Sequence, residues 1–464
     1  MCGQLFVCSL LLMFFPTLLL SFSSFAVSPP QQQGELPENG FTKTYVIKAD
    51  SAWLEDGVSV SPAFIKVTAG QIDWISSTDR RRDTKNLLGR PNPKPPLISV
   101  KGTLAPGIVD AWASFAPNGY MGDRRNPALR DVRESIPVQV KLADSQLYSQ
   151  VVAAREAGVA ASYMSPSWGS VRLGIGTPVE FTILDLPLVA GKPMLDFAVG
   201  ASGSNGDVFS ATNNAQGLYE EFVAAREWRE SLEEYDEKLE EFPEKLEKYD
   251  EKLKKYIEDK KAQEESGETP EKGKELKFPK RPKPPKAPQS NPETELLLAA
   301  MDGFYTLRVH AERLPDIHTI LQLKDEFNLD VILLGAFEAD LVADELRKAN
   351  VPVVLAATPS HHSNKSERSF YSRYMRLVEA GVEVAIASGG SDGYQMMLLV
   401  RAGNLVAQGA DRSAVWASLT SIPAKLLGLN QYGNLARGNS ATMLLFEGDS
   451  PFDASGAFKA HKPK

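Results

Sequence analysis

Cysteine is scarce in this chain of 464 residues. Its two cysteines, Cys2 and Cys8, both lie within the first ten residues. A disulfide-linked scaffold, a zinc ribbon and a cysteine nucleophile are therefore excluded from the body of the protein. That body must gain its stability from packing, because it has no thiols to cross-link.

An excess of positive charge is also missing. The chain has 51 Lys and Arg against 59 Asp and Glu, which gives a formal net charge of -8. Because nucleic-acid recognition needs a dense basic face, we expect no nucleic-acid partner. Apolar residues make up 43% of the chain, as in ordinary globular proteins. At roughly 150 residues per domain, the length predicts about three domains or one large barrel with additions.

The amino terminus lacks charge. No Lys or Arg precedes Lys43, and residues 5–25 carry no charged side chain. Small residues at Ser24 and Ala26 match what a signal peptidase reads, so we predict a cleaved secretory signal over residues 1–26 and export to the periplasm, envelope or exterior. The alternative is an uncleaved membrane anchor, because an apolar run of this length can just span a bilayer.

Charged residues are concentrated in one segment, residues 219–290. Leucines recur there every seven residues, each followed three residues later by an aromatic residue: Leu232, Tyr235, Leu239, Phe242, Leu246, Tyr249, Leu253 and Tyr256. This a/d pattern predicts a helix inserted into the fold. It is either an interaction helix, with self-association through residues 228–256 or binding to an envelope protein, or a solvated arm packed on its own domain. The second is favoured, because Pro243 interrupts a straight coiled coil.

The segment that follows, residues 278–288, reads FPKRPKPPKAP. Proline at this density predicts an extended polyproline conformation and excludes a helix. We expect a stiff return linker; binding of an anionic polymer is the other reading.

Short apolar runs outside the insertion predict strands. Those before it alternate between polar and apolar residues and predict a small antiparallel sheet, at residues 44–48, 64–67 and 71–75. Those after it alternate with helical spacings, with strands at 307–310, 331–334, 351–355 and 382–387. This alternation predicts parallel strands with crossover helices, in a barrel or a doubly wound sheet.

Four stretches resemble, in order, motifs of the amidohydrolase superfamily. Residues 102–111 (GTLAPGIVDA) resemble the motif that opens the first barrel strand, especially in the imidazolonepropionase-like branch. The other three resemble the fifth-strand His segment, a helix end and the closing strands of the flanking β-domain, at residues 309–317, 421–429 and 432–451. The resemblance covers most of residues 40–455 outside the insertion.

The resemblance implies an α/β fold: a (β/α)8 TIM-like barrel, a small flanking β-sandwich formed by both terminal segments, and the charged helical insertion. We expect the sandwich at residues 40–103 and 431–455, the barrel at 104–218 and 291–430, and the insertion at 219–290. The family hydrolyses amide and cyclic amide bonds, with water activated by divalent ions at the carboxyl ends of the barrel strands.

The family's metal-ligand positions are poorly matched. Its first strand ends in His-x-His, where this chain has Trp112 and Ser114, and only the fifth-strand histidine is retained, as His310. The sixth-strand histidine falls on Leu334 and the eighth-strand aspartate on Gly389. Because one ligand does not hold a catalytic ion, we expect no metal cofactor.

Other polar residues near these positions form the rest of the candidate site. Asp392 is a candidate catalytic residue if its loop is shifted toward the barrel mouth. Zinc or another divalent ion would bind, through His310, only if a displaced site forms with Asp392 and the pair His361 and His362. The expected binding residues are His310, Trp112, Ser114 and Ser388.

Three functions remain open from the sequence. The first is an exported amidohydrolase-like protein with lost or altered metal chemistry, a pseudoenzyme that binds a small molecule or an envelope protein. The second is an active amidohydrolase acting on amide or cyclic amide bonds through a displaced site near His310 and Asp392. The third is an envelope assembly protein that acts through the heptad insertion.

Overall fold

A computed structural model describes most of the chain, in two compact units. The predicted signal segment, Ser114 and Asp392 lie outside the described residues. The described residues are 44–54, 57–82, 84–85, 91–92, 94–113, 145–166, 172–181, 187–200, 208–266, 277–289, 291–357, 369–389, 394–448 and 450–452.

The first unit is a small β-domain built from both ends of the chain. One sheet has the order β5-β4-β1-β8, with β1 (Thr44–Ala49), β4 (Ala63–Thr68), β5 (Gln71–Ser76) and β8 (Leu97–Ser99). The other has the order β19-β9-β2-β3, with β2 (Ser51–Trp53), β3 (Ser59–Val60), β9 (Thr103–Pro106) and β19 (Met443–Phe446). A short hairpin joins β6 (Thr84–Lys85) and β7 (Pro91–Asn92).

Apolar side chains from both sheets form a single core in this unit. Ile47 and Ile65 come from the first sheet, and Leu104 and Met443 from the second. Alternation in β1 and β4 places these residues on the inner face. The antiparallel pairing of β19 with β9 joins the two terminal segments, so the flanking β-sandwich predicted from the sequence is confirmed.

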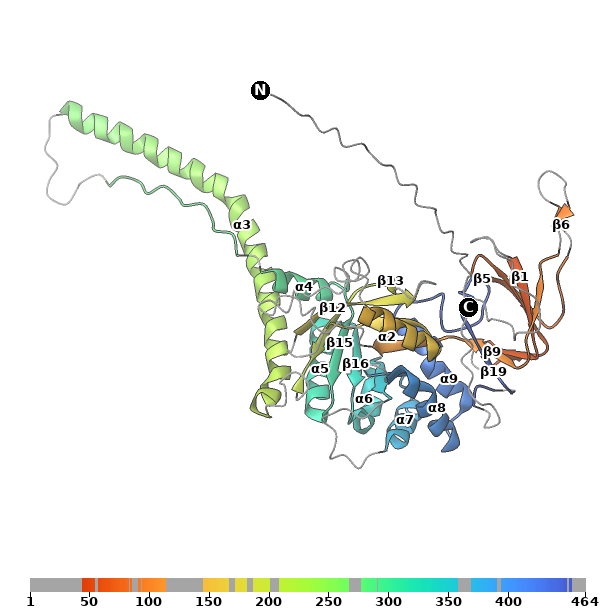
Figure 1. The fold of residues 1–464 in the computed structure, drawn as a ribbon. Helices are drawn as coiled ribbons and strands as arrows, with labels where there is room; N and C mark the ends of the chain where they lie inside the picture. Colours follow the sequence, from red (N-terminus) through yellow and green to blue (C-terminus); the bar gives the residue numbers. More distant parts are fainter. Residues whose placement is uncertain are drawn as a thin grey trace, which may run out of the picture. The chain divides into compact units, whose positions relative to one another are not determined.

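The second unit contains a sheet of eight successive strands that nearly closes into a barrel (Figure 1). At the open seam, the backbone N–H of Gly389 donates to the carbonyl of Trp112 at 3.1 Å, which links the last strand to the first. A short edge strand, β13 (Pro187–Val189), pairs with β12. In order, the eight are β10 (Ile108–Ala113), β11 (Val159–Met164), β12 (Arg172–Phe181), β14 (Met194–Ala198), β15 (Leu307–Ala311), β16 (Val331–Gly335), β17 (Val353–Ala356) and β18 (Val384–Ala387).

The third barrel strand departs from the expected parallel arrangement. β12 is antiparallel to both of its neighbours, β11 and β14, whereas every other neighbouring pair is parallel. Parallel strands need a crossover of about a dozen residues or more, and the connection from Met164 to Arg172 is too short for one. The chain therefore turns back, and β12 pairs with β11 in the antiparallel direction.

Helices cover the outside of the remaining strands. In α5 (Leu314–Phe327) the buried residues Ile317, Ile320, Leu323 and Phe327 recur at helical spacing, and the helix ends at Asn328 in the left-handed conformation. The other helices of the barrel are α2 (Ser145–Glu156), η3 (Ala339–Val342), α6 (Ala343–Lys348), α7 (Phe370–Glu379), η4 (Tyr394–Met396), α8 (Met397–Ala407), α9 (Arg412–Leu419) and α10 (Ser421–Leu426).

The insertion forms a single helix, α3 (Val208–Ser266), whose first part packs on the barrel. Its inner face buries Ala215, Leu218, Phe222 and Ala225, and the Phe222 ring lies 5.5 Å from that of Phe327 in α5. Helix α4 (Pro292–Met301) packs beside it; its Leu297 faces Gly174 and Leu195 across a small cavity. Helices α3 and α4 thus cover the wall where β12 lacks a crossover helix.

Beyond Trp228, α3 leaves the barrel, and residues 277–289 run back along it (Figure 1). We call these residues the linker, and α3 from Trp228 onward together with the linker the arm. The Tyr256 and Phe278 rings are 5.4 Å apart at one end, and Trp228 donates to the carbonyl of Gln289 at the other, at 2.9 Å. No helix in the described part of the chain has the length and apolarity to cross a membrane.

The linker has the repeat of a polyproline II helix. Every third residue is a half-buried proline: Pro279, Pro282, Pro285 and Pro288. Three residues make one turn of polyproline II, so all four prolines point to the same side. Most of the heptad leucines and aromatic residues of α3 are also half-buried. The linker therefore packs its prolines along the heptad face of its own helix.

The two parts of α3 should differ in their contribution to stability. We expect Phe222→Ala to lower the free energy of unfolding by about 3 kcal/mol, because it empties a fully buried site. Phe242→Ala is the matched control on the half-exposed arm and should cost under about 1 kcal/mol. Urea unfolding of both variants tests this; equal losses would contradict the division of α3 into a packed root and a solvated arm.

Candidate functional site

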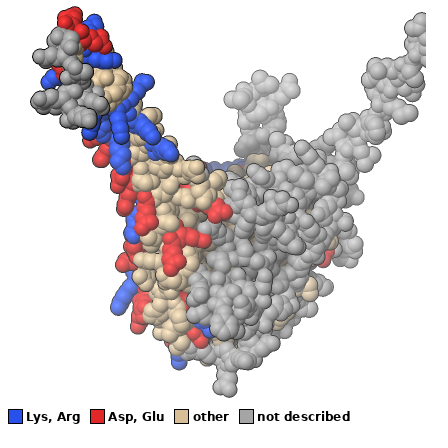
Figure 2. Space-filling view, turned by 90° about the vertical axis from the view of Figure 1, so that its left-hand side faces the viewer, with Lys and Arg blue, Asp and Glu red and all other residues tan. Residues whose placement is uncertain are grey.

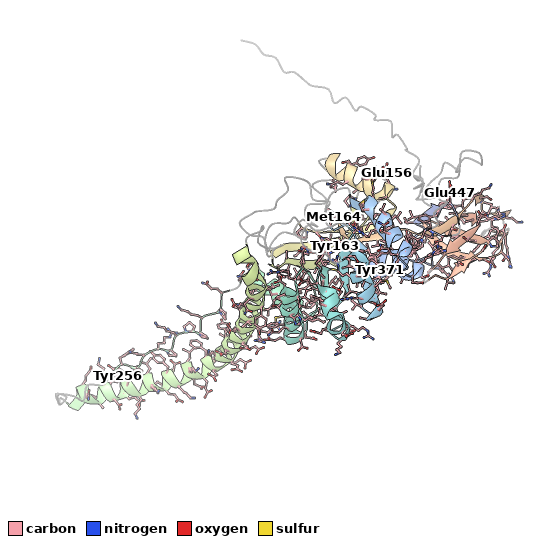
Figure 3. All side chains as sticks on the ribbon, turned by 90° about the horizontal axis from the view of Figure 1, so that it is seen from below. Glu156, Tyr163, Met164, Tyr256, Tyr371 and Glu447 are labelled. Carbon is pink, nitrogen blue, oxygen red and sulfur yellow. The ribbon has the colours of Figure 1, made fainter. Side chains whose placement is uncertain are left out.

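A buried polar cluster lies inside the barrel below its mouth. Arg308 of β15 pairs with Asp196 of β14, with 3.2 Å between Nη1 and Oδ1 and both side chains only 1% exposed. Its guanidinium also donates to the carbonyl of Ala111 at 2.6 Å and lies 3.4 Å from the ring centre of Tyr163. Figure 3 labels Tyr163 in the barrel unit. The Tyr163 hydroxyl donates to Asp196 at 2.6 Å. Gly176 leaves room for this cluster, since a Cβ there would lie 2.3 Å from that hydroxyl.

Burial governs the ionisation of Asp196. Desolvation raises the pKa of its carboxyl to about 6, and the charge of Arg308 and the Tyr163 hydrogen bond oppose that rise. Four strands are tied together by these contacts, because Ala111, Tyr163, Asp196 and Arg308 belong to β10, β11, β14 and β15. A buried pair of this kind fixes the arrangement of the strands, and breaking it leaves an uncompensated charge.

Two residues above Arg308 on the same side of β15, His310 lies at the barrel mouth. It is 6% exposed, and its ring meets that of Trp112 edge to face, with 5.0 Å between centroids and 61° between planes. Its Nε2 is 3.5 Å from Oε1 of Glu312. Gly335, with φ of +73°, makes space for it, because a Cβ there would lie 2.5 Å from Nε2. The Trp112 indole therefore packs directly on the one retained histidine.

The carbonyl end of β10 is held by β18. Asp110, fully buried, accepts hydrogen bonds from the N–H groups of Trp112 at 3.2 Å and Ser388 at 3.0 Å. The Ser388 hydroxyl donates to the carbonyl of Trp112 at 2.9 Å. Burial raises the pKa of the Asp110 carboxyl, and the hydrogen bonds from Ser388 and Trp112 oppose this. Ser388 thus fixes the backbone at the barrel mouth.

The positions that match the family's metal ligands do not suit a divalent ion. Trp112 and Leu334 are 2% and 1% exposed, both belong to the apolar core of the barrel, and Gly389 has no side chain. None of these three supplies a lone pair to a metal. Among the described residues no three His, Cys, Asp or Glu side chains gather as a possible metal group.

Of the predicted site residues, the structure brings together Trp112, His310 and Ser388. Ser114, Asp392 and the pair His361 and His362 lie outside the described residues. Glu312 was missed in the sequence, although it directly follows β15 and lies only two residues after His310. The cluster of Asp196, Tyr163 and Arg308 was also missed; it draws on three separate strands and leaves no local pattern.

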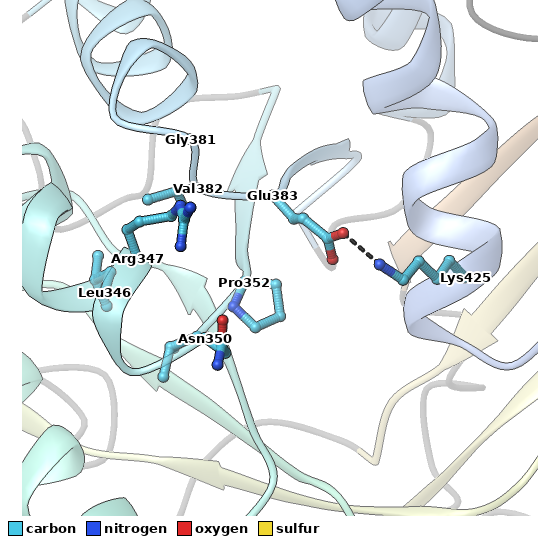
Figure 4. Close-up of a pocket in the computed structure, with 9 residues that line it drawn as sticks. Leu346, Arg347, Asn350, Pro352, Gly381, Val382, Glu383 and Lys425 are labelled. Atoms are coloured by element: carbon cyan, nitrogen blue, oxygen red, sulfur yellow. Dashed lines mark hydrogen bonds and ion pairs between the residues drawn. The ribbon is translucent and has the colours of Figure 1, made fainter.

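A separate hollow lies at the opposite end of the strands. It has a volume of about 360 Å³ and is bounded by the segments that lead into β17 and β18, including Arg347, Asn350 and Gly381 (Figure 4). An ion pair between Glu383 and Lys425 closes one side, and both side chains are exposed. In barrels of this type the amino ends of the strands serve stability rather than chemistry, so we assign no site there.

Comparison with solved structures identifies the architecture. An amidohydrolase from Thermotoga maritima superposes with a TM-score of 0.61 and 16% identity, over 89% of this chain and 96% of that one. The chain has the amidohydrolase fold. The ochratoxinase of A. niger matches with a TM-score of 0.48 and 12% identity, over 89% of this chain and 92% of that one. No family model and no curated protein sequence matches the chain.

The raised pKa of Asp196 predicts a pH dependence of stability. Its pKa of about 6 in the folded protein exceeds the ordinary carboxyl value of 3.8, so its favourable contribution is full below pH 3.8 and is lost as the pH rises through 6. Urea unfolding between pH 4 and 7 should show this decline. Asp196→Asn should flatten this decline, because the neutral amide does not ionise over this pH range. An unchanged slope in the variant would refute the assignment.

Proposed function

We propose that this protein uses the amidohydrolase fold to bind a small molecule, or a segment of an envelope protein, without metal-dependent hydrolysis. The observation that carries this proposal is the contact of Trp112 with His310. An indole stands against the retained histidine where the family would place a second imidazole. Hydrolysis on such a barrel needs about three protein ligands and a water held beside a base.

Leu334 and Gly389 support the same conclusion. The sixth-strand position is aliphatic and buried, and the eighth-strand position has no side chain to serve as a base. The fold remains intact around these losses, because the Asp110 and Ser388 hydrogen bonds hold the mouth in place. A preserved barrel with altered chemistry fits a binding role, and the imidazolonepropionase-like branch remains part of this proposal.

One observation favours a second candidate, an active amidohydrolase with a displaced site. Glu312 lies 3.5 Å from His310, so a carboxylate and an imidazole already face each other at the mouth. Such a pair can orient a base or provide two ligands for zinc. Asp392 would have to complete the site from its loop. The substrate would then be an amide or cyclic amide.

Metal analysis and hydrolysis assays on the purified protein separate the two candidates. We expect zinc well below one equivalent per chain and no zinc-dependent cleavage of amides or cyclic amides. His310→Ala and Glu312→Gln should leave the metal content unchanged, as should the control His318→Ala, a histidine on α5. About one equivalent of zinc that disappears in the first two variants but not in the control would establish the displaced site and overturn the binding proposal.

Export belongs to the same proposal. The apolar segment that ends near Ala26 supports cleavage by a signal peptidase and a mature protein outside the cytoplasm. Amino-terminal sequencing of the protein from its native cell tests this: a start within a few residues after Ala26 supports cleavage, and an intact Met1 supports the anchor.

A further inference from the structure

The heptad face of α3 is already partly covered by the chain's own linker. The contacts of Phe278 with Tyr256 and of Gln289 with Trp228 hold the linker at both ends of the arm. Ordinary coiled-coil pairing through this face would have to displace the linker. Any partner of the folded arm therefore meets the surface beside the linker.

Two large aliphatic side chains stay exposed on one line of the arm: Leu239, a heptad leucine that the linker leaves uncovered, and Ile257. Leu239 is 46% exposed and Ile257 is 45% exposed. They are eighteen residues apart, which is about five turns of 3.6 residues, so both project from the same side of α3, about 27 Å apart. Exposed aliphatic residues are otherwise sparse on this charged helix, and a partner that buries them gains their transfer free energy.

Charge is unevenly distributed along the same helix. From residue 230 to 251, eleven acidic residues stand against three basic ones, and from 252 to the end of α3 at Ser266 five lysines stand against four acidic residues. The linker adds basic residues and no acidic ones. Figure 2 shows basic side chains along the outer part of the arm, with acidic side chains both at its tip and nearer the barrel.

The basic residues of the linker are available to a partner. Lys280, Arg281, Lys283 and Lys286 are exposed, and within the described residues they take part in no ion pair. By contrast, Lys238, Lys245 and Lys248 on α3 each pair with a glutamate four residues earlier. The free positive charge of the arm therefore lies on the linker and the far end of the helix.

We propose that the arm is a self-association surface on which two copies of the chain pair antiparallel. In this arrangement Leu239 of one copy meets Ile257 of the second and the reverse contact forms at the other end, as two-fold symmetry requires. The acidic half of each arm then faces the basic half of the other. A parallel pair would oppose like charges along its whole length, so the charge pattern selects the antiparallel one.

Sedimentation of the full-length protein over a range of concentrations tests the pairing. We expect a dimer whose dissociation constant rises about tenfold or more between 0.05 M and 1 M salt, because screening weakens exposed charge pairs. The double substitution Leu239→Gln and Ile257→Gln should abolish the dimer. Glu237→Gln with Lys248→Gln is the control, since both lie on the opposite side of the helix and the net charge is unchanged. A monomer under all conditions, or equal loss in the control, would overturn the proposal.

Disulfide trapping tests the orientation. In chains with Cys2→Ser and Cys8→Ser, Leu239→Cys protein mixed with Ile257→Cys protein should form the mixed disulfide dimer far more than either protein alone. A parallel pair would cross-link each variant to itself. Such homodimers, or cross-linking no faster than for cysteine placed at Glu237, would contradict the antiparallel arrangement.

Discussion

The carboxylate of Asp110 in β10 accepts a hydrogen bond from the N–H of Ser388, which joins the first strand of the barrel to the segment that follows the last strand. The N–H of Trp112, also in β10, donates to the same carboxylate. Together with the bond from the N–H of Gly389 to the carbonyl of Trp112, this contact bridges the seam at which the sheet nearly closes. The same bonds, with the Ser388 hydroxyl on the Trp112 carbonyl, fix the backbone that carries the Trp112 indole. The environment of His310 thus depends on how the barrel closes.

Much of the fold could be predicted from the sequence, because its signals are local. The motif at residues 102–111 falls on β9 and β10, and the apolar runs at 331–334 and 382–387 fall on β16 and β18. The reversed strand β12 could not be predicted from such patterns. Its residues include Gly174, Gly176 and Pro178, and glycine and proline are uncommon within strands. Its direction depends on the short connections on either side of it.

Part of the candidate site could likewise be predicted from the sequence, and part could not. His310 and Trp112 were found because a motif carries them, and the structure brings their rings into contact. Arg308 stood two residues from His310 but had no visible partner, since Asp196 lies more than a hundred residues earlier in the chain. Long-range pairing of buried charges follows from the closed sheet and not from any local pattern. The sequence therefore indicated the mouth of the barrel but not the polar layer beneath it.

The pairing of the linker with α3 limits how long such an arm can be. One heptad of helix rises about 10.5 Å, whereas three residues of polyproline II rise about 9.3 Å. Each heptad of α3 is therefore about 1.2 Å longer than the linker turn beside it. Over the four heptads present, the difference adds up to about half a turn of the linker. A longer arm would need an extra linker residue, which would turn the following prolines away from the helix. If the repeats of the arm were duplicated, the linker prolines should therefore lose contact with α3 before the arm had doubled in length.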